Sequence, residues 1–378
     1  MAPELETPDS PPADDAHDVE PAARGVANKL ASRARHVCLL IGAGASCSAG
    51  LPTLAGLQKI VVDGLAEPDK SLIEAMFKTW NVEACLSRLR RIHALLRGDD
   101  QLEGITATKA RELDVEICRL IAAAVDSSKS SPESFKSLAS WVARMDTTRP
   151  VEVFTINYDL LIERGLETVG VPYFDGFIGG VEAPFMPDLV EPRDAPASRA
   201  LPSGYVRLWK LHGSTNWRTR ELDGTKRTVR IAATSSDGVA AIYPSDEKYD
   251  EARRVPFVVL MDRFRRALVE PETITITTGF SFGDAHLNEM LFDAARRHPR
   301  SEVVALCYAT IPDIVASEAA TTRNLVVLSP TEAIIDGRRA PWRSRADIPG
   351  VFEDDRLLLG DFAKLAPFLA REVAQPNG

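Results

Sequence analysis

Short, nearly continuous apolar runs recur along the chain and are typical of β-strands that are covered on both faces. The first run, V-C-L-L-I at residues 37–41, stops at Gly42. Further runs rich in β-branched residues occupy residues 151–155, 206–211, 273–278, 302–308 and 325–328. Amphipathic helical patterns lie between several of them, over residues 159–169, 284–297 and 312–320. Strands that alternate with helices predict an α/β fold with a doubly wound, Rossmann-like parallel sheet.

One long stretch, about residues 55–146, interrupts this alternation because it contains no convincing strand. Asn81 is the expected N-cap of a helix whose apolar residues follow at helical spacing. Two more amphipathic segments lie at residues 113–125 and 135–145. A stretch of this length is too long for a loop, so we predict an all-helical insertion.

A second interruption covers about residues 171–255. Its first part, residues 171–204, is rich in proline and is predicted to be an irregular covering loop. Residues 216–232 follow as a β-hairpin that turns at Asp223-Gly224.

The two ends of the chain differ in character. Residues 1–24 are acidic and proline-rich, with almost no large apolar side chains, and predict a disordered tail. Residues 25–378 are predicted to form one domain, which closes with an amphipathic helix at residues 360–373.

Composition narrows the classes of protein that fit. The chain of 378 residues is 45% hydrophobic and 26% charged, as is ordinary for a globular protein with a large core. Its net charge of −9 argues against direct binding of nucleic acid. No apolar run approaches the roughly 18–20 residues that span a bilayer, and the acidic N-terminus is unlike a signal peptide, so we expect a cytoplasmic protein without a membrane contact. Five cysteines without a C-x-x-C pair predict neither a disulfide framework nor a thiolate zinc site.

The glycine-rich segment after the first strand is the first candidate for chemistry. It reads G-A-G-A-S at residues 42–46 and G-L-P-T at residues 50–53. Glycine lets a backbone turn tightly and approach a pyrophosphate at a helix N-terminus, although such turns are also common without a ligand. Nucleotide-dependent oxidoreductases place an acid about twenty residues further on. Asp63 has that spacing but lies in helical sequence, which disfavours an oxidoreductase.

Polar side chains also follow two later strands. Asn157 and Asp159, in T-I-N-Y-D, can hold ribose hydroxyls or a water, or they can cap the next helix. His212, in K-L-H-G-S, titrates near neutrality and can act as a general base or orient a ribose hydroxyl. A lone histidine is also often purely structural. The glycine after His212 permits close approach of a ligand.

A fourth candidate lies at the end of another strand, where T-G-F-S-F-G-D at residues 278–284 precedes His286 and Asn288. Its small residues can cradle a phosphate or the adenine ribose, while Asp284 can equally be an N-cap. All four candidates lie at strand ends. Because ligands of open α/β sheets bind at the carboxyl ends of the strands, we expect one common rim.

In this order and spacing, the four motifs resemble the sirtuin superfamily over about residues 35–308. The N-Y-D, L-H-G-S and G-x-S-F-x-D-x-H-x-N patterns resemble in particular the bacterial sirtuin-like proteins of antiphage defence. The resemblance implies NAD+ as substrate and Asn157 and His212 as catalytic residues. The residues that it implies for binding NAD+ are Gly42, Ala43, Gly44, Ala45, Ser46, Pro52, Thr53, Asp159, Gly279, Ser281, Asp284, His286 and Asn288.

Two departures from the family pattern qualify this resemblance. Deacetylases of the family usually carry four zinc-binding cysteines after the catalytic histidine, but only Cys307 follows His212 here. No zinc is therefore expected, and protein deacylation is disfavoured. Leu54 stands where an aromatic residue often follows the G-L-P turn, which affects the expected packing over the cofactor.

The predicted function is hydrolysis of NAD+ to nicotinamide and ADP-ribose, as the effector of an antiphage defence system. ADP-ribosyl transfer, deacylation and a non-catalytic NAD-binding regulatory subunit remain the alternatives. The resemblance further implies a homo-oligomer and a partner protein. A HerA-type hexameric ATPase is favoured over a prokaryotic Argonaute, because Argonaute-linked forms often carry an additional fused domain. The helical insertion and residues 171–204 are candidate assembly surfaces or lids, or simple packing decoration.

Overall fold

The computed structural model describes residues 16–147, 149–191, 205–222, 224–232, 241–242 and 255–372. The strands of its central sheet are β1 (His36–Ile41), β4 (Val151–Thr155), β5 (Tyr173–Phe174), β7 (Val206–Lys210), β12 (Thr273–Thr278), β13 (Glu302–Leu306), β14 (Leu325–Leu328), β15 (Glu332–Ile335) and β16 (Arg338–Pro341). Their order is β16-β15-β14-β13-β12-β1-β4-β7-β5, parallel from β14 to β5 and antiparallel at β15 and β16. The predicted α/β fold with a Rossmann-like parallel sheet is confirmed.

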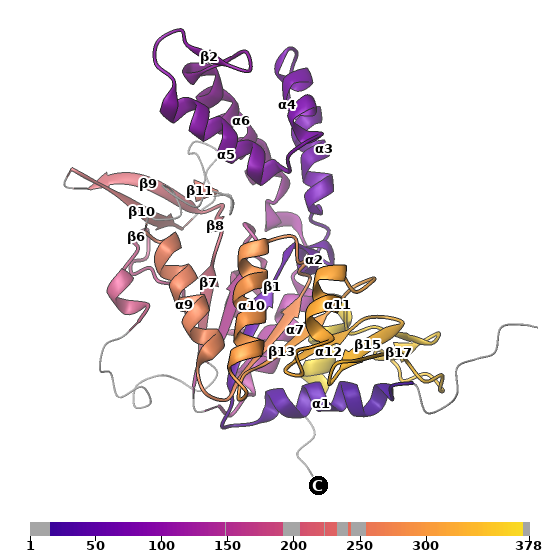
Figure 1. Ribbon diagram of the computed structural model, residues 1–378. Helices are drawn as coiled ribbons and strands as arrows, with labels where there is room; N and C mark the ends of the chain where they lie inside the picture. The colour runs from indigo at the N-terminus through magenta and orange to yellow at the C-terminus, as the bar shows by residue number, and fades with distance from the viewer. Residues whose placement is uncertain are drawn as a thin grey trace, which may run out of the picture.

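Helices cover both faces of this sheet (Figure 1). Along β1, Val37, Leu39 and Ile41 join one hydrophobic cluster, while Cys38 and Leu40 join the other. The helices of the first cluster are α1 (Val19–Ala31), α7 (Glu133–Ala143), α8 (Leu161–Val169) and α12 (Phe362–Glu372). Those of the second are α9 (Phe257–Val269), α10 (Ala285–Arg297) and α11 (Asp313–Ala319). Coverage on both faces explains why the strand sequences are apolar without alternation.

The helical insertion projects beyond one end of the sheet (Figure 1, top). It contains α3 (Leu54–Gly64), α4 (Asp69–Phe77), α5 (Val82–Leu95) and α6 (Ala107–Ala124), which share a hydrophobic cluster separate from the two sheet faces. Asn81 caps α5 as predicted, since its Oδ1 accepts a hydrogen bond from the Ala84 N–H at 2.8 Å.

Two details of the insertion were predicted wrongly. It is not all-helical, because a short antiparallel pair, β2 (Gln101–Leu102) and β3 (Ile105–Thr106), connects α5 and α6. Its last expected segment is α7, which packs with the sheet cluster instead of with the insertion. Amphipathic spacing shows that a helix buries one face, but it does not identify the surface against which that face packs.

The second interruption contains the predicted hairpin, formed by β9 (Trp217–Leu222) and β10 (Thr225–Ile231). The segment that we expected to be irregular contributes β5 to the edge of the main sheet. It also contributes β6 (Glu182–Pro184), which pairs with β10, and the short 3-10 helix η2 (Pro187–Leu189). Residues 192–204, 233–240 and 243–254 of this region lie outside the described residues, as does Asp223 of the predicted turn.

The remaining small elements lie along the edges of the fold. A 3-10 helix, η1 (Ser127–Lys129), follows the insertion, and β8 (Gly213–Ser214) pairs with β11 (Ala241–Ile242). A two-stranded pair, β17 (Phe352–Glu353) and β18 (Arg356–Leu357), precedes α12. Among the described helices, none combines the length and the apolar character that crossing a membrane requires.

Helix α1 begins within the segment that we predicted to be a disordered tail. The Asp18 side chain accepts a hydrogen bond from the Glu20 N–H at 3.2 Å, and the helix continues from Val19. Val19 and Ala23 are buried in the sheet cluster. Their small apolar side chains give a weak periodic signal, and their burial depends on a sheet that forms elsewhere in the sequence. Residues 1–15 of the expected tail lie outside the described part of the chain.

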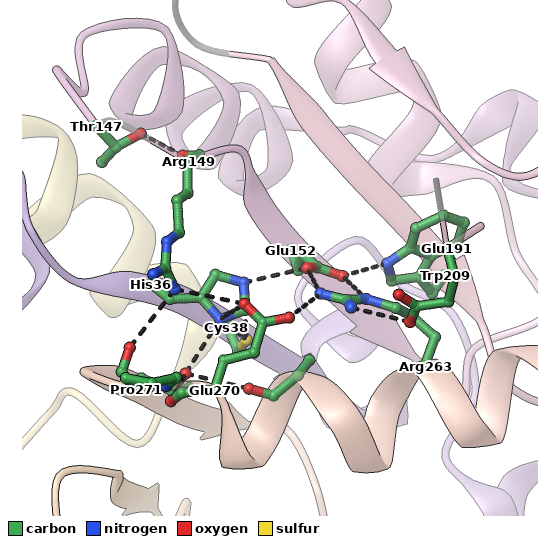
Figure 2. Close-up of polar contacts among 12 residues, drawn as sticks. His36, Cys38, Thr147, Arg149, Glu152, Glu191, Trp209, Arg263, Glu270 and Pro271 are labelled. Carbon is green, nitrogen blue, oxygen red and sulfur yellow. Dashed lines mark hydrogen bonds and ion pairs between the residues drawn. The ribbon is translucent and has the colours of Figure 1, made fainter. Parts of the chain in front are cut away.

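A buried charge network joins the amino ends of β1 and β4 to α9 (Figure 2). Glu152 accepts hydrogen bonds from His36 Nε2 at 3.1 Å, from Trp209 Nε1 at 2.7 Å and from the guanidinium of Arg263. Glu270 lies 3.5 Å from His36 Nδ1, and the three potential ligand groups are close enough to hold a metal ion. Because Arg263 donates to both oxygens of Glu152, this cluster is satisfied by a cation that the chain itself supplies.

We expect this network to make the free energy of unfolding fall as pH rises from about 6.5 to 10. Burial lowers the pKa of His36, but its contacts with Cys38 and Glu152 outweigh this effect and raise it to about 10. The proton on His36 therefore stabilises the fold fully below its ordinary pKa of 6.5. That contribution is lost as pH rises through the folded-state value, at about 1.4 kcal/mol per pH unit.

Urea unfolding of the wild type and of His36→Gln across this pH range measures the effect. The variant should be less stable near neutral pH and should lose less stability on the alkaline side. Parallel curves for the two proteins would contradict the assignment to His36.

Candidate active site

The glycine-rich turn after β1 packs directly against the end of β12. Gly42 is the N-cap of a short helix, α2 (Ala43–Cys47), and its N–H donates to the Thr278 carbonyl at 3.0 Å. The Gly44 N–H donates to the Gly279 carbonyl at 2.9 Å. A Cβ atom on Gly42 would lie 2.5 Å from that same carbonyl oxygen. These glycines are therefore required for contact between two strand ends, in addition to any contact with a ligand.

This packing changes the expected role of two backbone donors. The N–H groups of Gly44 and Ala45 already donate to the carbonyls of Gly279 and Gly42, at 2.9 and 3.0 Å. A pyrophosphate at this turn would have to replace those acceptors. The backbone at Gly44 is nevertheless exposed, so a ligand can reach the turn.

The N-Y-D motif lies beside this turn, at the end of β4. Asn157 Nδ2 donates to Ser46 Oγ at 2.9 Å and to the Gly42 carbonyl at 3.0 Å. The Ser46 hydroxyl donates to Asp159 Oδ2 at 2.7 Å, while Asp159 Oδ1 accepts from the Leu161 N–H at the start of α8. Asp159 thus holds the first residue of α8 and is also the acceptor that orients Ser46. The predicted proximity of the first two motifs is found in the structure.

The amide oxygen of Asn157 is buried and has no hydrogen-bond partner among the described residues. The same is true of Thr278 Oγ1, at the end of β12 on the other side of β1, and of Asn288 Oδ1 on α10. Buried polar atoms are rarely left unpaired, because each such atom costs about 1–3 kcal/mol. Unpaired polar atoms at the ends of β4 and β12, the two strands that flank β1, indicate a place where a polar ligand or water binds.

Two carboxylates face the ring of His212, which is only 3% exposed. Its Nδ1 lies 3.6 Å from Glu83 Oε1, and its Nε2 lies 3.3 Å from Asp284 Oδ2. Neither ring nitrogen has an aligned hydrogen-bond partner in the described part of the chain. Burial alone would lower the pKa of His212, but Asp284 and Glu83 raise it to about 9. The ring is therefore a cation at neutral pH.

Asp284 has both of the roles that its sequence allowed. Its Oδ1 caps α10 by accepting hydrogen bonds from the N–H groups of His286 and Leu287, at 2.9 and 3.1 Å. Its Oδ2 faces His212. Helix α10 thereby fixes the carboxylate at the rim, and contact with His212 lowers the pKa of Asp284 despite its burial.

Glu83 is the residue of this site that the sequence did not reveal. It lies in the first turn of α5, and its carboxylate accepts a hydrogen bond from the Tyr158 hydroxyl at 2.8 Å. Tyr158 stands between Asn157 and Asp159 in the chain, so it connects the two halves of the site. The N-cap at Asn81 marked a helix start, but nothing in the sequence placed that helix over His212.

The other predicted residues lie around this centre without joining it closely. Thr53 is exposed and caps α3, accepting from the Gly56 N–H at 3.1 Å, with Pro52 directly before it. Ser281 and His286 are exposed. Asn288 is buried and donates to the Phe282 carbonyl at 2.7 Å, which holds the loop after β12.

A buried lysine at the end of β7 contacts the same edge of the sheet. Lys210, the last residue of β7, donates to the Asp159 carbonyl and to Glu163 Oε1, the latter at 3.1 Å. Burial raises the pKa of Glu163, although the nearby Lys210 opposes that effect. This pair fixes the end of β7 next to α8, two residues before His212.

These features define an α/β protein whose polar site lies at the carboxyl edge of a parallel sheet. The family model of the SIR2-like domain matches residues 151–327, from the start of β4 into β14. The matched segment contains Asn157, His212 and Asp284 but neither the glycine-rich turn nor Glu83. This segment is thus similar to the SIR2-like domain.

Solved structures of similar fold include two Sir2 homologues. One is a mutant Sir2 homologue in complex with ADP-ribose, with 14% sequence identity, a TM-score of 0.41, and coverage of 93% of this chain and 96% of that chain. The other is a complex of a Sir2 homologue with NAD, with 12% identity, a TM-score of 0.47, and coverage of 95% of each chain. No curated protein matches the chain.

Proposed function

We propose that this protein is an NAD+ glycohydrolase, which cleaves NAD+ to nicotinamide and ADP-ribose. The observation that carries the proposal is the burial of both Asn157 and His212 just after β4 and β7, at one sheet edge, with polar atoms that have no hydrogen-bond partner among the described residues. The SIR2-like match across both residues supports the same substrate class.

In the proposed reaction, the bond between the ribose carbon and the nicotinamide nitrogen breaks. Its electron pair goes to the pyridinium, which leaves as neutral nicotinamide. A water oxygen bonds to the cationic, oxocarbenium-like sugar carbon and then loses a proton to a base. The leaving group is neutral, so no acid is needed, and the chain mainly positions the sugar and excludes bulk water.

Each residue of the site has a role in this proposal. The free Oδ1 of Asn157 accepts a hydrogen bond from a ribose hydroxyl or from the attacking water. His212, a cation at neutral pH, donates to a ribose hydroxyl, and it acts as a base only in the fraction of molecules that have lost a proton. The exposed turn at Gly44 and the exposed Ser281 are proposed to contact the pyrophosphate and the adenosine side.

The test is to incubate the purified chain with NAD+ and to quantify nicotinamide and the sugar product by chromatography. We expect Asn157→Ala to lower the rate roughly 10²-fold, because the ribose and the water lose their position. Since Asn157 also holds Gly42 and Ser46, thermal unfolding must show that the variant remains folded.

The products separate this proposal from its alternatives. Free ADP-ribose supports hydrolysis, whereas labelled ADP-ribose on a protein would indicate transfer. NAD+ that binds without release of nicotinamide, alone and with a partner, would instead favour a regulatory subunit. Full activity in Asn157→Ala would contradict the assigned site.

We further propose that this activity depletes NAD+ in antiphage defence, in an assembly with a HerA-type hexameric ATPase. The N-Y-D, L-H-G-S and G-x-S-F-x-D-x-H-x-N patterns support this proposal, because they resemble the defence-associated group. A fall of cellular NAD+ on infection that disappears in His212→Ala would support it. Size-exclusion chromatography with light scattering, with and without the ATPase, would test the assembly.

A further inference from the structure

Glu83 is carried to the active-site edge by an element that belongs to the insertion. The side chains of Val82 and Leu86 are buried in the insertion's own hydrophobic cluster, which fixes the first turn of α5. The N–H of Ala84 is already capped by Asn81, at 2.8 Å. The Glu83 carboxylate is therefore not required to begin the helix, and it points instead to Tyr158 and His212.

The groups that face His212 come from three separate elements. Glu83 belongs to α5, Asp284 is the N-cap of α10, and Tyr158 follows β4 and reaches Glu83 through its hydroxyl. Two carboxylates so near each other repel, which makes both of them costly to bury without a cation. A doubly protonated His212 supplies that cation, with one ring nitrogen at ion-pair distance from each carboxylate.

Structural packing alone leaves this arrangement unexplained. The distances of 3.6 and 3.3 Å are ion-pair distances, and within the described parts of the chain neither His212 nitrogen nor Asp284 Oδ2 has an aligned hydrogen bond. A purely structural cluster would be expected to satisfy these buried atoms. They retain the capacity to bind a hydroxyl or a water, which connects the charge on His212 to substrate contact.

We infer that Glu83 is a positioning residue of the active site, through which the helical insertion holds His212 in its doubly protonated form and fixes its ring. The effect of Glu83 on the rate of nicotinamide release rests on the proposed function, but its effect on the protonation of His212 does not. A doubly protonated ring donates at both nitrogens and cannot take a proton from water. Any movement of α5 away from the sheet edge would release the His212 proton more readily.

The first experiment is a titration that needs no substrate. NMR of histidine-labelled protein, with the His212 signal assigned by its loss in His212→Gln, gives the pKa of His212 directly. Glu83→Gln should lower it by about one to three pH units, since an adjacent opposite charge shifts a pKa by that much. If Glu83→Gln does not fold, Tyr158→Phe replaces it. This variant removes the hydrogen bond to Glu83 and should change the pKa of His212. Glu74→Gln, on the exposed surface of α4, is the matched control and should leave it unchanged.

The second experiment is the pH profile of nicotinamide release. The rate should change as His212 loses its proton. In Glu83→Gln the inflection of this profile should move to lower pH by the same amount as the pKa measured by NMR. Glu83→Asp should restore most of the wild-type profile. A His212 pKa that is the same in wild type and in both folded variants would overturn the inference. A shifted NMR pKa in a protein that releases no nicotinamide would instead contradict the proposed function alone.

Discussion

Replacing His212 with alanine should lower the rate of nicotinamide release by about 10²–10⁴-fold, the range typical for loss of an acid–base residue. The ring lies at ion-pair distance from two carboxylates, and neither of its nitrogens has an aligned hydrogen-bond partner among the described residues. Alanine removes the donor for the ribose hydroxyl and the positive charge that His212 carries at neutral pH. Initial rates of nicotinamide formation, measured by chromatography at saturating NAD+, give the effect.

The control for this substitution is His93→Ala, which removes an exposed histidine from α5 and should leave the rate unchanged. His212→Ala also leaves Glu83 and Asp284 facing each other without a cation, so circular dichroism and thermal unfolding must accompany the kinetics. A folded variant with wild-type activity would refute the role of His212.

Gly279→Ala should lower the free energy of unfolding by roughly 2–5 kcal/mol, from a left-handed backbone and from overpacking. Gly279 has a φ of +61°, and an added Cβ atom would lie 2.3 Å from the Ala45 backbone nitrogen. The nearest atoms, from Ala45, Gly44 and Gly42, are all backbone atoms, so they cannot move without separating the β1 turn from the end of β12. Urea unfolding measures this loss, and the activity of the remaining folded protein reports whether the turn has shifted.

Gly283 provides a matched control in the same loop. A Cβ atom there would meet only the Ser281 hydroxyl, at an ordinary 3.4 Å. We expect Gly283→Ala to change stability by less than about 1 kcal/mol, as is usual at exposed positions. Equal destabilisation by the two substitutions would mean that the contact between Gly279 and Ala45 is not what makes glycine necessary there.

The sequence predicted the local elements at the carboxyl edge of the sheet, because strand ends and helix caps are local signals. Asn157 and Asp159 follow a run of apolar residues at β4, and Asp284 precedes a helical pattern at α10. Local rules also allowed two readings of Asp284, as a cap or as a site residue. In the structure its two oxygens serve both purposes.

Contacts between distant segments could not be predicted in this way. Glu83 lies 129 positions before His212 in the sequence, and only the packing of the insertion against the sheet edge brings them to 3.6 Å. The protonated state of His212 depends on that contact, so the sequence suggested a base where the fold holds a cation at neutral pH.

By itself, then, the sequence determined the alternation of strands and helices, the helix starts and the residue types available at each strand end. These follow from hydrophobic periodicity and from capping, which act over a few residues. The tertiary structure decided that α1 packs beneath the sheet, that Gly44 and Gly279 bond to each other, and that a carboxylate from the insertion faces the histidine. Burial and charge at a site depend on groups that are near in space but far apart in the chain, and these determine the chemistry of His212.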